Sequence, residues 1–406
     1  MKYLWLVLLL MLLAFGCSGK KDNELTVWTP LLPEGRAVLR ELFQEFQKEH
    51  PDITITEVYY ENEELRTNFT IAAMGGSGPE LVYGPSDQIG IYTIMETLQP
   101  MEPFFSDEEL EEYVPEALTR ANGHLYQIAN RIGNHLCLIY NKKYIPKPPA
   151  TFSELIKMGK SLTQDINNDG LMDRYALAWN YIEPYFLIPF ITSFGGEILD
   201  TNNRPVLNTD AVVQAFMLVD SLRNYYNIIP QECDYNLAES MFKQEKAAMI
   251  INGPWSFLGY LKAGVDFGIT RIPKNDRTSQ WPKPFYSPWG FSINVNLTGK
   301  RLENTIKLLK FLLKKESQFK FAKRLRIIPA LKSLRQDSLL LQDPFIRQSM
   351  YQLEVAVPTP IAPELRAVWD ALRPYYQGVL NGSLSPQEAA KLAQQDADKK
   401  IKELWD

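Results

Sequence analysis

The order of local structure near the start of the chain constrains the fold most. The stretches at 24–28 and 53–60 have the apolar and β-branched character of strands, and the segment between them carries apolar residues at helical spacing. A second helical segment, a glycine-rich turn at 75–80 and a short strand at 81–84 follow. This alternation of strands and helices predicts an α/β fold with a largely parallel sheet.

The length of the chain allows more than one domain. A chain of 406 residues has room for about two domains. No linker-like segment divides it, and its last helix is predicted at 385–404, with Ser385 as N-cap and Pro386 at the first helical position. The sequence therefore predicts one large domain or two lobes that the chain crosses more than once. The net charge of −5 argues against a nucleic-acid partner.

The N-terminus has the pattern of an export signal. Lys2 precedes an apolar run at 3–15 that is too short to span a bilayer, and Cys17 follows at the end of that run. We expect residues 1–17 to be a signal peptide that ends at a lipidated Cys17, with residues 18–24 as a tether. The protein would then lie outside the cytoplasm, anchored to a bacterial membrane in the periplasm or at the cell surface. An ordinary cleaved signal or an uncleaved signal anchor stays open, because Phe15 is unusual between the small residues.

The residues that carry common chemistry do not form a known catalytic or metal motif. Cys137 and Cys233 are too few for a disulfide framework, so we expect two free thiols. The histidines at 50, 124 and 135 lack metal-ligand spacing, and no phosphate or dinucleotide loop is found. We therefore predict no catalytic residue and no cofactor. A pair of carboxylates, as in a glycoside hydrolase, stays open.

Residues 245–257, EKAAMIINGPWSF, hold a strong local signal. The apolar run at 247–251 is typical of a buried strand, and the Asn-Gly-Pro sequence after it ends the strand in a turn. Trp255 follows at once, so a large aromatic side chain is presented where the strand ends.

Aromatic residues beside turns are the main functional candidates. A sugar ring has an apolar C–H face that an aromatic ring can cover, and hydroxyls that carboxylates and amides can bind. Each such residue, taken singly, could equally belong to the core. The set is Trp28, Tyr83, Tyr185, Trp255, Trp289 and Trp369.

The stretch DINNDGLMD, at 165–173, has part of an EF-hand calcium loop. The matching residues are Asp165, Asn167, Asp169 and Asp173 with side-chain oxygens, Gly170 at the turn, and Leu171 with its carbonyl. The bidentate glutamate expected at the end is absent, because Ala176 stands there. The alternatives are a structural calcium ion and an ordinary Asx-rich turn.

Five segments match one known family in order. They are GPELVYGPSDQIG (78–90), LIYNKKYIPKPPATFSEL (138–155), EPYFLIPFITSFGGEILD (183–200), AAMIINGPWS (247–256) and VWDALRPYYQGVLNGSLSPQEA (368–389). They resemble the extracellular solute-binding proteins of ABC importers, in the maltose/maltodextrin-binding branch. The resemblance extends over nearly all of residues 25–404.

The resemblance implies an α/β periplasmic-binding-protein fold, with two lobes and a ligand cleft between them. The first lobe would hold residues 25–130 and 267–327, and the second 131–266 and 328–406. The crossovers would fall near 131–136, 265–268 and 327–330.

The resemblance also implies the ligand-binding residues. Trp255, Tyr185 and Trp369 would stack on sugar rings, Glu183 and Asp87 would accept hydrogen bonds from hydroxyls, and Phe186 is a further aromatic candidate. Trp28 would lie at the cleft floor, unless it is a core residue. The first lobe departs from well-known maltose binders, with Gly84 at an aromatic position, Gln88 at an arginine position and Asn134 near a crossover glutamate.

Together these features imply a monomeric, lipid-anchored protein that binds an oligosaccharide, in the first place a maltodextrin, and delivers it to an ABC transporter permease. It would catalyse no reaction. The alternatives are a binding protein for another oligosaccharide or a polyol, and a cell-surface glycoside hydrolase.

Overall fold

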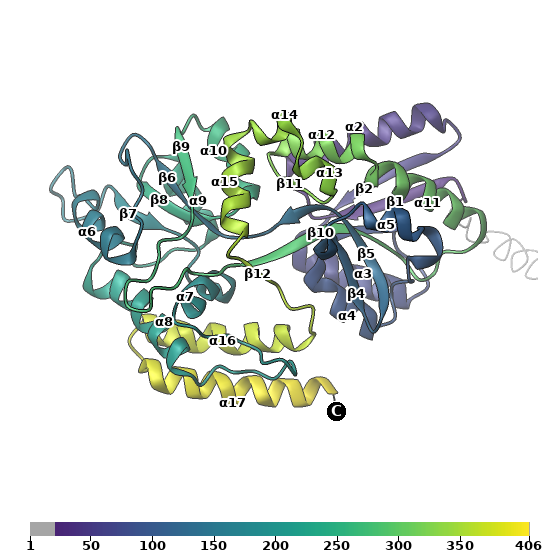
Figure 1. The fold of residues 1–406 in the computed structure, drawn as a ribbon. Helices are drawn as coiled ribbons and strands as arrows, with labels where there is room; N and C mark the ends of the chain where they lie inside the picture. The colour runs from purple at the N-terminus through teal and green to yellow at the C-terminus, as the bar shows by residue number, and fades with distance from the viewer. Residues whose placement is uncertain (1–20, 406) are drawn as a thin grey trace, which may run out of the picture.

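The computed structural model describes residues 21–405 and shows two α/β lobes side by side (Figure 1). One lobe is built on an eight-stranded sheet and the other on a four-stranded sheet. The predicted fold class is confirmed. The predicted signal peptide and Cys17 lie outside the described residues, and the first strand begins at Glu24, the last residue of the predicted tether.

The sheet of the first lobe mixes parallel and antiparallel strands. Its order is β11 (Ile328–Pro329), β5 (His124–Gly133), β10 (Phe285–Ile293), β3 (Leu81–Pro85), β1 (Glu24–Thr29) and β2 (Thr54–Tyr59), with β4 (Leu118–Ala121) beside β5 and β12 (Val357–Pro358) beside β10. The predicted parallel pairing holds for β1 with β2 and β3. However, β10 runs antiparallel to β3 and β5, since it returns to this sheet from the other lobe.

Helices cover the first sheet because each carries an apolar stripe. In α2 (Pro33–Glu49) the predicted stripe from Val38 to Phe46 is buried. The other helices of this lobe are α3 (Asn62–Met74), α4 (Ile89–Ile94), α5 (Asp107–Glu111), α11 (Gly299–Leu313), α12 (Lys315–Leu325), α13 (Lys332–Arg335) and α14 (Ser338–Leu341).

The sheet of the second lobe is smaller and more deeply buried. Its order is β7 (Tyr175–Ala178), β8 (Ala247–Asn252), β6 (Cys137–Asn141) and β9 (Phe267–Thr270). Every residue of β8 is buried, as its unbroken apolar run predicts. The helices here are α6 (Phe152–Leu162), α7 (Ile188–Ser193), α8 (Asp210–Asp220), α9 (Tyr235–Lys243), α10 (Phe257–Lys262), α15 (Pro344–Leu353), α16 (Glu364–Leu380) and α17 (Pro386–Trp405).

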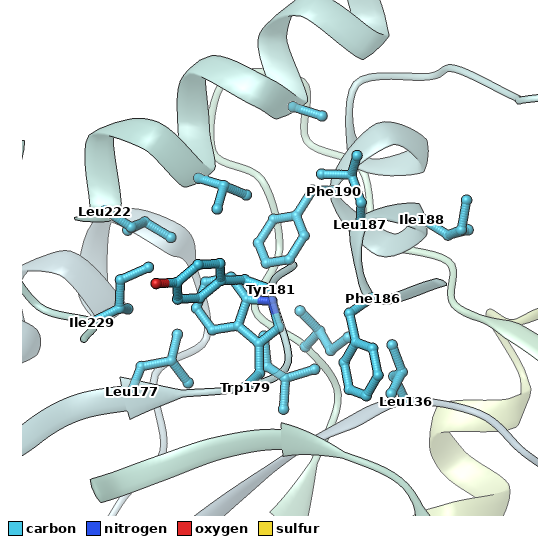
Figure 2. Close-up of a cluster of buried hydrophobic side chains, with 14 of the residues drawn as sticks. Leu136, Leu177, Trp179, Tyr181, Phe186, Leu187, Ile188, Phe190, Leu222 and Ile229 are labelled. Carbon is cyan, nitrogen blue, oxygen red and sulfur yellow. The ribbon is translucent and has the colours of Figure 1, made fainter. Parts of the chain in front are cut away.

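An aromatic cluster forms the centre of the second lobe. Figure 2 shows Trp179, Tyr181 and Phe190 together, with Phe186 beside Leu136. The Trp179 ring lies 5.7 Å from Tyr181 and 5.5 Å from Phe190, measured between ring centroids. Packing of this kind holds the short turn at Pro184–Leu187, which connects the cluster to the region between the lobes.

Two of the predicted crossovers are displaced. The chain leaves the first sheet between Gly133 and Cys137, within the predicted range. It returns after Thr270 rather than at 265–268, because β9 pairs with β6 in the second sheet.

The third crossover lies at α15 rather than at 327–330. The short strand β11 pairs with β5 in the first sheet, and Leu334 and Ile346 belong to the first lobe's core. Phe345, the residue just before Ile346 on α15, packs against Phe267 of β9 in the second lobe, with 4.9 Å between ring centroids. The apolar segments at both displaced crossovers could join either sheet, so only strand pairing decides where they go.

The two cysteines inside the described region are free thiols, as expected. Both are buried, and burial raises the pKa of the Cys233 thiol to about 12. Within residues 21–405, no helix is long and apolar enough to cross a bilayer.

Candidate functional site

A cleft of about 580 Å³ lies between the lobes and is lined by both. On the first lobe it lies at the carboxyl ends of parallel strands, where Pro30, Tyr59 and Pro85 line it next to β1, β2 and β3. Open α/β sheets commonly bind ligands at this edge, because the loops that follow the strands meet there.

Six of the seven predicted ligand-binding residues line this cleft. They are Asp87, Glu183, Tyr185, Phe186, Trp255 and Trp369. Phe186 is 5% exposed and is mainly a core residue, although it is among the residues that line the cleft. The six come from four segments of the chain, at 87, 183–186, 255 and 369, which only the tertiary fold brings together.

The placement of Trp28 at the cleft floor is wrong. Its ring packs against Tyr60, with 4.8 Å between centroids, and against a buried cluster that contains Leu65 and Phe69. Side chains alternate between the faces of a strand, and Val27 and Thr29 are the buried neighbours on the other face of β1. Trp28 is therefore a packing residue beside the sheet, which was the alternative left open.

Trp255 is held at the end of β8 by three local features. The chain turns through a 3₁₀ segment at Pro254–Ser256, and the indole Nε1 donates a hydrogen bond to the Tyr235 hydroxyl at 3.0 Å. The ring lies so close to the backbone that a Cβ on Gly253 would be 2.0 Å from it. Glycine is therefore required at 253 for this ring position, which the sequence pattern alone did not predict.

A buried hydrogen-bond network supports the same strand end. The Asn252 amide donates to Glu239 Oε1 at 2.7 Å and to the Tyr260 hydroxyl at 2.8 Å, while its Oδ1 accepts from the Gly253 N–H at 2.9 Å. Buried polar groups that are fully bonded fix one conformation, because any other arrangement leaves some of them without partners.

Glu183 is paired with an arginine that the sequence analysis missed. Arg373 Nη2 donates to Glu183 Oε1 at 2.9 Å, and its Nε donates to Oε2 at 3.3 Å. Arg373 lies four residues after Trp369 on α16, so both side chains are on the same face of that helix. Glu183, the predicted acceptor for sugar hydroxyls, thus lies in the cleft wall, and its bidentate ion pair with Arg373 fixes the orientation of its carboxylate.

Tyr185 connects the cleft to the first crossover. Its hydroxyl donates a hydrogen bond to the carbonyl of Asn134, which has a left-handed backbone with φ of 56°. Burial raises the pKa of Tyr185, so the hydroxyl stays protonated and remains a donor. The ring is partly buried and lines the cleft.

Asp87 stands in the first-lobe wall, directly after β3. Burial raises the pKa of its carboxyl from 3.8 to about 6, and the negative charge of Glu63 adds to this shift. Gln88, at the predicted arginine position, is not in the lining. It donates to Asn62 Oδ1 at 3.0 Å and so supports an amide that does line the cleft.

Two ion pairs join the lobes across the cleft. Lys262 of α10 lies 2.5 Å from Glu34 of α2, and Arg366 of α16 lies 2.7 Å from Glu63 of α3, measured from nitrogen to oxygen. Glu34, Glu63 and Arg366 also line the cleft. The lobes therefore contact each other on both sides of the space that a ligand would fill.

Several lining residues had no role in the sequence analysis. They are Tyr59, Asn62, Arg131, Tyr235, Arg366 and Arg373. Trp289, one of the aromatic candidates, also lines the cleft. The spacing of Arg366 and Arg373 from Trp369, by three and four residues on one predicted helix, is a signal that could have found two of them. The other positions depend on which strands are neighbours.

The loop at 165–173 is held by its own side chains. Asp165 accepts from the Gly170 N–H at 2.8 Å, and Asp173 accepts from the Ile166 N–H at 2.7 Å. No group of three metal-ligating side chains is assembled anywhere in residues 21–405, as far as His, Cys, Asp and Glu are concerned. Calcium binding here stays a prediction, and thermal melts with Ca²⁺ and with EDTA are the measurements that decide it.

Comparison with known proteins agrees with this fold and cleft. A family model described as bacterial extracellular solute-binding protein matches residues 41–347. The chain is 43% identical to the maltose/maltodextrin-binding domain MalE from Bdellovibrio bacteriovorus, solved bound to maltotriose, with a TM-score of 0.89 over 93% of this chain and 100% of that one.

Two curated relatives are more distant. A galactooligosaccharide-binding protein of Bacillus subtilis is 25% identical over 95% of this chain and 91% of its own length. A maltooligosaccharide ABC transporter solute-binding lipoprotein of Streptococcus pneumoniae is 25% identical over 81% of this chain and 77% of its own length. All three are named as binding proteins, in agreement with the prediction that this chain is not an enzyme. On its matched residues and its two-lobed fold, the chain belongs to the bacterial extracellular solute-binding proteins.

Proposed function

We propose that this protein captures a maltodextrin between its two lobes and delivers it to an ABC transporter permease. One observation carries the proposal. A single cleft is lined by three aromatic side chains of the second lobe, Tyr185, Trp255 and Trp369, and by polar groups of the first lobe such as Asp87 and Asn62.

This arrangement suits a sugar because it offers both kinds of contact that a sugar needs. Aromatic rings cover the C–H faces of successive glucose units, while carboxylates and amides accept or donate hydrogen bonds at the hydroxyl edges. The cleft volume of about 580 Å³ is within the range of roughly 300–1,000 Å³ that small-molecule sites occupy.

The two-lobed fold supports a delivery role. A ligand that contacts both lobes favours the closed form over the open one, by the difference in its affinity for the two forms. The ion pairs Lys262–Glu34 and Arg366–Glu63 join the lobes in this structure. A permease that recognises the closed form would then receive only loaded protein.

The comparisons favour a maltodextrin over other sugars. The relative that is 43% identical was solved with maltotriose, and the pneumococcal relative is named for maltooligosaccharides. The second candidate is another oligosaccharide, because the Bacillus subtilis relative is named for galactooligosaccharides. Neither Gly84 nor Gln88 lines the cleft, so the aromatic and arginine contacts of well-known maltose binders are absent at these positions, which would suit a different hydroxyl pattern.

A calorimetric titration with maltose, maltotriose, maltotetraose, a galactooligosaccharide and sorbitol tests the proposed ligand. We expect the maltodextrins to bind more tightly than the other two by at least about tenfold, equivalent to roughly 1.4 kcal/mol. Tighter binding of the galactooligosaccharide would favour the second candidate. Release of glucose or maltose from maltotriose during a long incubation would contradict a purely binding role.

Replacing Trp255 tests the aromatic wall. Trp255→Ala removes one stacking face, so we expect maltotriose to bind about 10- to 300-fold more weakly, from the lost ring contact and the lost apolar burial. Trp28→Ala is the matched control. It removes a partly buried tryptophan outside the cleft, so it should lower the melting temperature and leave the affinity unchanged. A Trp255→Ala variant that melts much lower but binds normally would show that Trp255 is a core residue only.

The raised pKa of Asp87 predicts a pH-dependent stability. The folded pKa of about 6 exceeds the unfolded value near 3.8, so folding favours the neutral carboxyl. Stability from this group is fully present below pH 3.8 and is lost as the pH rises through 6. Asp87→Asn removes that loss, so we expect the melting temperature of the variant to be roughly 2 °C higher than that of wild type at pH 7.5 and equal to it at pH 4. A variant that melts lower at pH 7.5 would contradict this cause.

The Asp87→Asn variant should also bind maltotriose about tenfold more weakly, because an uncharged acceptor replaces a charged one.

We also propose that Cys17 carries a lipid that anchors the protein to the membrane. The proposal rests on the short apolar run before Cys17 and on the pneumococcal relative, which is named as a lipoprotein. Palmitate labelling of cells that express the full chain should label wild type and leave Cys17→Ala unlabelled, with the variant released from the membrane fraction. Equal labelling of both would contradict the anchor.

A further inference from the structure

Arg131 lies in the cleft at a position where no ligand-binding role was expected. It is on β5, opposite Trp289 of β10, and Trp289 is in turn opposite Pro85 of β3. All three residues line the cleft, so they form one row across the floor where the first sheet meets the space between the lobes.

A β-bulge gives Arg131 its place. Trp289 is paired with Arg131, but the next residue, Gly290, is paired with Ala129, so Asn130 is an extra residue in β5. Ala129 is part of the buried core, and a regular strand would direct Arg131, two residues later, to the same side. The extra residue changes this direction, and bulges next to binding sites commonly do so.

The bulge is a built feature of the sheet. Asn130 is buried, and its Oδ1 accepts a hydrogen bond from the Tyr83 hydroxyl at 2.9 Å. A Cβ on Gly290 would lie 2.2 Å from the carbonyl oxygen of Ile128, so only glycine permits this approach of the two strands.

The Arg131 guanidinium has an aromatic support but no carboxylate partner. Its Cζ lies 4.2 Å from the centroid of the Trp289 ring. Within residues 21–405 it forms no ion pair, and its Nε is buried without a hydrogen-bond acceptor. The other two arginines of the cleft are paired, Arg366 with Glu63 at 2.7 Å and Arg373 with Glu183 at 2.9 Å. The guanidinium hydrogen-bonds to the Tyr83 hydroxyl, and the Arg131 side chain is only partly buried. An arginine has five N–H donors, so donors remain for a ligand oxygen, and such a contact would also satisfy the unbonded Nε.

The charge of the cleft indicates whether the ligand oxygen belongs to an acidic group or to a neutral hydroxyl. Five carboxylates line the same space, from Glu34, Glu61, Glu63, Asp87 and Glu183. Three arginines line it as well, so the lining keeps a small excess of negative charge, which disfavours an acidic ligand. A neutral sugar with two neighbouring hydroxyls fits the fork of N–H donors on the guanidinium without that repulsion.

We infer that Arg131 is a ligand-binding residue, which donates hydrogen bonds to a pair of neighbouring hydroxyl oxygens on one sugar unit while the Trp289 ring supports its guanidinium. This inference rests on the proposed function, and it adds a polar contact on the cleft floor to the aromatic contacts of the second lobe. Arg131 thereby selects for the position of that hydroxyl pair.

The test uses calorimetric titration of maltotriose into the full-length folded protein and into three variants. Arg131→Met keeps the length of the side chain and removes its donors, and we expect about 10- to 100-fold weaker binding. Arg131→Lys keeps the charge without the fork, so it should bind between wild type and Arg131→Met. The matched control is Arg120→Met on β4, where the arginine is exposed and pairs with Glu102 outside the cleft. It should bind like wild type.

Thermal melting of each variant separates binding from folding. If Arg131→Met does not fold, the comparison of Arg131→Lys with wild type decides, and at least threefold weaker binding supports the inference. Binding of the folded Arg131 variants within twofold of wild type would overturn it, while wild type still binds maltotriose. Failure of wild type to bind any maltodextrin is a different result, since it would overturn the proposed function itself.

Discussion

The division of the chain into two sheets decides where this protein can bind a ligand. Three crossings connect the lobes, and the first is only the stretch between Gly133 and Cys137. Each sheet has its own buried core. The space between the lobes is therefore left to polar loops, strand ends and helix faces. A ligand that enters it contacts residues from both lobes and is coupled to their relative position.

The walls of the cleft depend on packing that lies behind them. Trp255 owes its position to the bonded network around Asn252 and to the absence of a Cβ at Gly253. Tyr185 and Glu183 are carried by a turn that the Trp179 cluster holds (Figure 2). Side chains fixed in this way lose little entropy when a sugar binds, because they are already in their final positions.

The charges of the cleft are largely balanced within the protein. Glu183 is bound by Arg373, and Glu63 is bound by Arg366 across the lobes. Asp87 and Arg131 are different, since the pKa of Asp87 is raised by burial and Arg131 has no ion-pair partner in the described chain. Such groups reduce the stability of the empty protein, and functional sites commonly accept that cost in return for binding. Both are on the first lobe, which is also where the sequence departs from well-known maltose binders.

The sequence by itself determined the elements and the family. Strand and helix alternation predicted the α/β class, the apolar run at 247–251 predicted a buried strand, and Ser385 caps the last helix as its pattern predicts, accepting from the Glu388 N–H at 3.2 Å. These features are local, because a residue's neighbours in the chain decide them. The five matching segments led to the assignment of six cleft residues, because a residue at a matching position in the family is expected at the same place in the fold.

Only the tertiary structure decided what depends on neighbours that are distant in the chain. In the structure, β9 and β11 belong to sheets other than those expected, and Trp28 lies beside the first sheet. Arg131 lies in the cleft because of a bulge in β5. In each case the outcome depends on which strand pairs with which, and in what register. A shift of one residue in register turns a side chain from one face of a sheet to the other, and no local pattern records that choice.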